Sequence, residues 1–122
     1  MTAGTALAAV LVAAATDTIE RRFAPPEGFH RLAAPRGSFA EWLRAQPLRP
    51  GRPPVTLHDG RAKADQTAHV AVLDLAVGSR DLQQCADAII RLRFDFLWAA
   101  KRQALACFRL TDGSWASWAR WG

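Results

Sequence analysis

The sequence predicts an α+β fold, in which a small, mostly antiparallel sheet packs on one long amphipathic helix. Three observations predict this class. Apolar residues recur at steps of three and four from about residue 81 to 102, the period of a helix with a buried face. Short runs typical of strands flank this stretch, and the Asp-Gly pairs at 59–60 and 112–113 are typical of hairpin turns. A chain of 122 residues has room for one small domain.

Residues 1–17 predict a signal peptide. Ala6 to Ala15 form a ten-residue apolar run, which is too short to cross a bilayer and suits a signal-peptide core. Small residues at Ala13 and Ala15 suit a cleavage site, although no Lys or Arg precedes the run. A packed N-terminal helix is the other interpretation, and we favour export to the periplasm or cell envelope.

The next stretch predicts an irregular leader and then a short helix. Three prolines and two glycines interrupt residues 18–37, which resist regular structure. A helix near 38–45 is expected because Ser38 and Glu41 have the spacing of a capping box, in which each side chain binds an exposed amide. Pro47 then ends it.

Several short strands are expected around hairpin turns. Asp59-Gly60 predicts a tight type I′ turn between two strands, because this dipeptide tolerates positive φ. The run HVAVLDLAV is apolar on both faces, as in a strand covered on both sides, and its Asp74 needs a cationic partner such as an Arg or Lys63. The expected strands are residues 55–58, 61–63, 69–77 and 105–111.

The long helix is expected over about 81–102, with Ser79 or Asp81 as its cap. Its apolar stripe packs on the preceding strand. We expect residues 38–122 to be the N-terminal portion of a single α+β domain. The stripe consists of Leu82, Cys85, Ala86, Ile89, Ile90, Leu92, Phe96 and Leu97.

The formal charge of +5 comes from 14 Arg and 2 Lys against 11 acidic residues. The arginines are scattered among prolines and acids, whereas nucleic-acid-binding faces cluster them, so no nucleic-acid partner is expected. The charge is compatible with envelope polymers or peptides as partners. No apolar run has transmembrane length. The two cysteines and three histidines have no zinc-site spacing, so neither a metal nor another cofactor is expected.

Cys85 is the main candidate for chemistry, and two interpretations of it stay open. It is either a small buried hydrophobic residue or a nucleophile whose thiolate is stabilised near a helix N-terminus. His69 is the histidine considered as a partner base. A strand-edge polar role for His69 is favoured, because the base usually follows the nucleophile in papain-like folds and no histidine follows Cys85.

Three tryptophans near the C-terminus give a second candidate site. Trp115, Trp118 and Trp121 recur at three-residue steps and can stack on sugars or peptides as a ligand-binding surface. The alternative is that they are core residues. In that case further sequence must cover them, and the chain would be truncated.

Four blocks, taken in this order, resemble the front part of an uncharacterised bacterial family, domain of unknown function 4846. The blocks are PPEGFHR at 25–31, SFAEWLR at 38–44, the run from LRPGRPPVTLHDG to DLQQCADAIIRLR at 48–93, and TDGSWASWARWG at 111–122. The resemblance implies an exported or lipid-anchored envelope protein that is longer than this chain and has no established activity.

The resemblance also implies a function for Cys85. A later strand of the family carries a histidine, and a helix-start cysteine followed by such a histidine resembles the layout of cysteine hydrolases. We therefore expect an N-terminal fragment of an envelope protein that is inactive alone. The alternative is a cysteine-dependent amidase or peptidase with Cys85 as nucleophile and its base missing from the chain. A weaker alternative is a binding module that uses the three tryptophans.

Overall fold

The computed structural model describes residues 17–121, without the side chain of Trp121, and it confirms the α+β class. The signal peptide expected over 1–17 lies almost wholly outside the described residues. The elements, in chain order, are α1 (Ile19–Arg22), α2 (Phe39–Arg44), α3 (Cys85–Ala99), the 3-10 turn η1 (Gln103–Leu105), β1 (Cys107–Arg109), β2 (Trp115–Ser117) and α4 (Trp118–Trp121).

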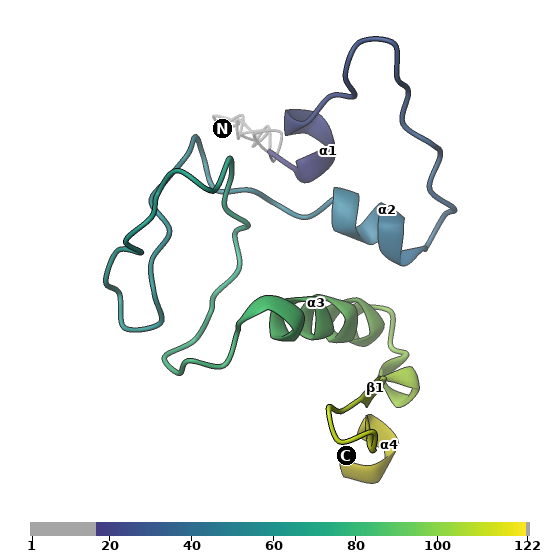
Figure 1. Ribbon diagram of the computed structural model, residues 1–122. Coiled ribbons are helices and arrows are strands. Elements are labelled where there is room, and N and C mark those ends of the chain that lie inside the picture. The colour runs from purple at the N-terminus through teal and green to yellow at the C-terminus, as the bar shows by residue number, and fades with distance from the viewer. Residues whose placement is uncertain (1–16, 122) are drawn as a thin grey trace, which may run out of the picture.

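Helix α3 is the central element of the described chain (Figure 1). Helix α2 lies along one side of α3, and η1, the β1–β2 hairpin and α4 lie on the other side near its C-terminal end. The long connection between α2 and α3 forms a set of loops beside the N-terminal end of α3 (Figure 1). The two halves of α3 therefore have different neighbours.

The predicted start of α2 is confirmed. The Ser38 hydroxyl accepts a hydrogen bond from the Glu41 amide at 3.2 Å. The Glu41 carboxylate accepts from the amide of Gly37 at 2.6 Å, one residue earlier than in a standard capping box. The leader is less irregular than expected, because Thr18 caps the single helical turn of α1.

The strand predicted over 69–77 is wrong. This segment makes only a bridge, in which Leu73 lies opposite Leu48 and the Asp74 amide donates to the Pro47 carbonyl at 2.9 Å. The partner segment 47–54 contains four prolines, which lack the amide needed to continue a ladder. The cationic partner expected for Asp74 is Arg49, whose Nε lies 3.6 Å from the carboxylate.

The turn at Asp59-Gly60 is not the predicted type I′ turn. Only Gly60 has a positive φ, of +84°. The Gly60 amide donates to Leu57, and the Leu57 amide donates to Arg61 at 2.7 Å, so the loop has three residues and ends in a left-handed glycine. The flanking strands predicted at 55–58 and 61–63 make one bridge, between Thr56 and Ala62.

Helix α3 is shorter than the predicted 81–102. Its N-cap is Gln84, whose amide donates to the Asp87 carboxylate at 3.3 Å. The helix begins later than predicted because the preceding residues fold back, and the Gln83 side chain donates to the Val77 carbonyl. Its end is a Schellman motif, in which Lys101 has φ +55° and the Arg102 amide reaches the Leu97 carbonyl at 2.7 Å.

Aromatic rings cover the second half of α3 on two sides. Phe96 packs against Phe39 at 5.3 Å and Trp42 at 6.0 Å between ring centroids, which joins α3 to α2. On the other side, Phe94 packs against Trp118 at 5.4 Å. The buried core between these groups is Phe96, Leu97 and Ala106.

Candidate functional site

A groove of about 350 Å³ lies between the first half of α3 and the loops that precede it. Its walls are mostly aliphatic, and arginines stand on both sides of it. The Arg91 guanidinium donates to the Ala76 carbonyl and lies 3.4 Å from Asp95, which fixes it across the groove. The lining residues from α3 and the segment before it are Gln83, Ala88, Arg91 and Leu92, and those from the loops are Arg49, 54–56, 71–73, Leu75 and Val77.

Cys85 is the first residue of α3, and its thiol is exposed. It is not among the residues that line the groove, although Ala88 and Leu92, three and seven positions further along α3, are. Its φ is +29°, a left-handed value that is uncommon for a residue other than glycine. Within the described chain Cys85 is therefore not a buried core residue.

His69 is not brought to Cys85. Its Nε2 lies 3.0 Å from the Pro53 carbonyl, and its own carbonyl accepts from Arg52 at 2.9 Å. No hydrogen bond joins His69 to Cys85 in the described part of the chain, and His69 does not line the groove. The favoured structural role for His69 agrees with these contacts.

A different histidine lies close to the start of α3. His58, in the three-residue loop, has its Nδ1 3.9 Å from the Asp81 carboxylate. Asp81 in turn accepts from the Gln84 side chain at 3.2 Å, and Gln84 immediately precedes Cys85. This pair could not be predicted from the sequence, because His58 and Asp81 lie 23 positions apart and no local pattern relates a loop to a distant helix cap.

The polar amides near this site are used in the fold. The Gln66 side chain donates to the Val55 and Lys63 carbonyls at 2.9 and 2.6 Å. Gln83 donates to Val77 at 2.9 Å. These amides hold the groove walls together, and a substrate oxyanion would have to displace their present acceptors.

Two of the three tryptophans, Trp115 and Trp118, have described side chains, and their surroundings differ. Trp115 is 58% exposed and lies opposite Arg109 on the outer face of the hairpin. Trp118 packs on α3, 5.6 Å from the Trp98 ring. The side chain of Trp121 is outside the described residues. Of the described pair, Trp115 is the more exposed, at 58% against 37% for Trp118.

Within residues 17–121, no three His, Cys, Asp or Glu side chains are grouped so that they could hold a metal ion. None of the described helices has both the length and the apolar character needed to cross a bilayer.

The described residues form an α+β fold with an exposed cysteine at the start of α3, between two residues, Gln83 and Ala88, that line an aliphatic groove. A family model matches residues 19–122, and the chain belongs to this family, which is described as domain of unknown function (4846). The resemblance found from the four sequence blocks is thereby confirmed. Neither a curated protein nor a solved structure matches the chain.

Proposed function

We propose that this chain works as one part of an exported bacterial envelope protein and is inactive alone. The observation that supports this proposal is the uncovered first half of α3, where Ile89 is 65% exposed. Leu82 and Ile90 are exposed beside it. A helix with apolar residues on several sides is normally enclosed by other layers of structure, which indicates that additional polypeptide covers this one.

Export is tested by the N-terminus of the mature protein. Expression in a bacterial host followed by mass spectrometry of the secreted or periplasmic fraction should show cleavage after Ala15. Ala13→Gln should block processing, because the third residue before the cut must be small, whereas Ala14→Gln should be processed. An intact N-terminus in all three proteins would contradict export through a cleaved signal.

A second candidate function is a cysteine-dependent amidase or peptidase of the envelope. The exposed Cys85, its strained backbone and the adjacent groove favour it, because strained residues cluster at active sites. The thiolate would attack the amide carbonyl and form a thioester, and the amine would leave with a proton. Water would then release the acid and restore the thiol. His58, paired with Asp81, is the proton acceptor offered by the described residues.

Thiol alkylation tests this second candidate. Cys107 is also free and exposed, so it serves as an internal control in the same molecule. Iodoacetamide at neutral pH, with peptide mass spectrometry as readout, should alkylate Cys85 at least tenfold faster than Cys107 if Cys85 is an activated nucleophile. His58→Ala should remove this advantage if His58 is the base. Equal rates for the two cysteines would contradict a nucleophilic role.

A further inference from the structure

The part of the chain after α3, residues 100–120, carries a concentration of unpaired positive charge. We call these residues the C-terminal lobe. The lobe contains four cations and one carboxylate, Asp112, which gives a net charge of 4 − 1 = +3. Each of the four cations is exposed, and none has an ion-pair or hydrogen-bond partner for its side chain in the described chain. They are Lys101, Arg102, Arg109 and Arg120.

Many arginines outside the lobe are used differently. Arg22 pairs with Asp17, Arg49 lies 3.6 Å from Asp74, and Arg61 lies 2.6 Å from Asp59. Others bind carbonyl groups of the loops, as Arg44 does with Leu32. The cations of the lobe are therefore available to a partner molecule, whereas many of the other cations already bind carboxylates or carbonyl groups within the fold.

Large apolar side chains are exposed in the same lobe. In the β1–β2 register, Phe108 and Ala116 face each other, and both line the pocket against Phe94. The alternate positions, Arg109 and Trp115, therefore lie opposite each other on the outer face. A cation and a tryptophan thus stand side by side on the exposed face of the hairpin.

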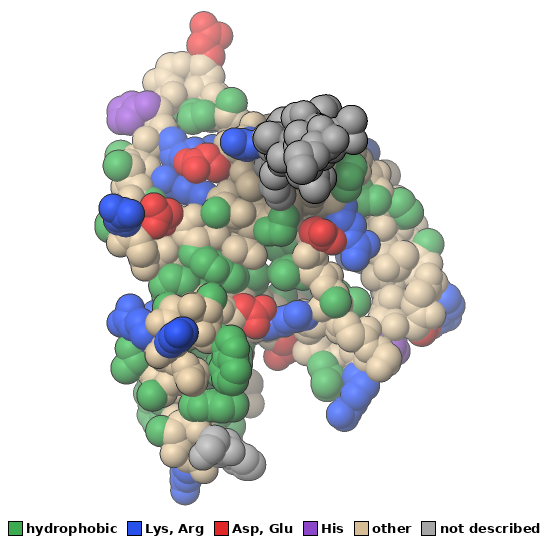
Figure 2. Space-filling model, turned by 180° about the vertical axis from the view of Figure 1, so that it is seen from behind, with side chains coloured by type: hydrophobic (Ala, Val, Ile, Leu, Met, Phe, Trp, Pro, Cys, Tyr) green, Lys and Arg blue, Asp and Glu red, His purple; other side chains and the backbone are tan. Residues whose placement is uncertain are grey.

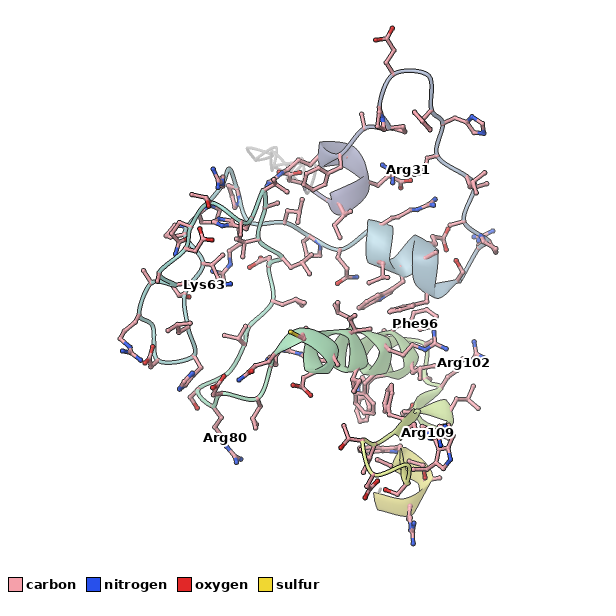
Figure 3. The ribbon with its side chains drawn as sticks, in the orientation of Figure 1. Arg31, Lys63, Arg80, Phe96, Arg102 and Arg109 are labelled. Atoms are coloured by element: carbon pink, nitrogen blue, oxygen red, sulfur yellow. The ribbon has the colours of Figure 1, made fainter. Side chains whose placement is uncertain are left out.

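Two leucines add exposed apolar area to the lobe. Leu105 in η1 is 59% exposed, and Leu110, directly after β1, is also exposed. Figure 2 shows hydrophobic side chains gathered over the end of the molecule that holds the lobe, with Lys and Arg side chains around them. Figure 3 labels Arg102 and Arg109 on this lobe, beyond the C-terminal end of α3.

We propose that the C-terminal lobe binds membrane surfaces rich in anionic lipids. Exposed Trp and Leu side chains gain free energy when they enter the boundary between headgroups and acyl chains, and cations beside them pair with lipid phosphates. A soluble polyanion would pair with the cations, but it would not bury the side chains of Leu105 and Leu110. A second copy of the lobe would bring one charge of +3 against another. The proposal does not depend on the reactivity of Cys85.

Sedimentation with lipid vesicles tests this proposal on the full chain. The probes are vesicles of phosphatidylcholine alone and vesicles that contain about one third phosphatidylglycerol. The chain should bind the anionic vesicles, bind the neutral ones at least tenfold more weakly, and lose most of the binding in 0.5 M salt.

Matched variants separate the lobe from net charge. Arg109→Gln with Arg120→Gln should lower binding at least tenfold. Arg36→Gln with Arg80→Gln removes the same charge from exposed, unpaired positions outside the lobe and should leave binding nearly unchanged. Leu105→Ser should also weaken vesicle binding while leaving binding to soluble polyphosphate unaffected. Equal losses in the two double variants, or no effect of Leu105→Ser, would overturn the proposal.

Discussion

At the residue scale, three aspartates stabilise the loops by the same local contact. Asp59, Asp65 and Asp112 each accept a hydrogen bond from the backbone amide two residues ahead, at 2.7 to 3.0 Å. Thr67 and Ser114 add a hydroxyl donor to the second and third of these carboxylates. Such contacts favour the ionised carboxylate and hold the chain in a turn.

These hydrogen bonds lower the pKa of all three carboxyl groups. The main cause for Asp112 is the Ser114 hydroxyl, followed by the Ser114 amide. For Asp65 the Thr67 hydroxyl comes first, and for Asp59 the amide of Arg61 comes first, before its guanidinium. Since a lowered pKa means preferential binding of the ionised form, the turns are supported above the ordinary value of 3.8 and lose that support as pH falls through the lowered pKa.

A pH titration checks this for the hairpin turn. We expect the Ser114 amide resonance to move with a midpoint below pH 3.8, as the Asp112 carboxylate gains its proton and the hydrogen bond weakens. Asp112→Asn keeps an oxygen acceptor that does not titrate, so the midpoint should disappear in that variant. A midpoint at or above 3.8 in the unchanged protein would contradict the contact.

The sequence could predict residue roles where they depend on near neighbours. Ser38 caps α2 because the contact needs only its own segment. The exposure of Cys85 could not be predicted from the sequence. An apolar stripe shows which side of a helix favours burial, but it does not show whether another segment packs against that side. The pairing of His58 with Asp81 likewise depends on how a loop folds back.

At the element scale, two hairpin turns share one sequence pattern and one geometry. LHDGR at 57–61 and LTDGS at 110–114 both close a three-residue loop with a left-handed glycine. Gly60 and Gly113 have φ values of +84° and +85°, and each donates its amide to the leucine at 3.0 Å. Asp-Gly therefore predicted the positions of the turns correctly, and the register around them was set by the flanking residues.

The predicted elements were wrong where the prediction assumed that another segment would pack against them. The segment 69–77 has strand-like composition, but the neighbouring segment 47–54 is rich in proline and has too few amides for a ladder of β-sheet hydrogen bonds. The helix was predicted too long at its N-terminal end, because Gln83 and Gln84 side chains can bind loop groups and end the helix as readily as they continue it.

The two halves of α3 should respond differently to truncation. Leu97 is 2% exposed, so Leu97→Ala should lower the free energy of unfolding by about 2–5 kcal/mol. Ile89→Ala on the same helix removes an exposed side chain and should cost less than about 0.5 kcal/mol. Urea unfolding followed by helical circular dichroism measures both changes. A cost at Ile89 as large as that at Leu97 would show that the first half is covered.

At the scale of the whole molecule, other segments pack more closely against the second half of α3 than against its first half. Phe39, Trp42 and Phe96 pack on one side of its second half, and Phe94 meets Trp118 on the other. The first half has the groove along one side and exposed side chains such as Ile89 on another. This arrangement supports the proposal that the chain is one part of a larger packing unit.

Amide hydrogen exchange along α3 tests whether its first half lacks tertiary packing in this chain. The amides of 89–92 and 95–98 are all within the helix, and the second group lies closer to a helix end. Stronger protection of the second group would therefore come from tertiary packing and not from its distance to the helix end. In the chain alone we predict at least tenfold stronger protection for 95–98 than for 89–92, because local opening is easiest where few apolar contacts must break. Equal, strong protection of both groups would contradict the account, since residues of this chain would then already cover the first half of α3.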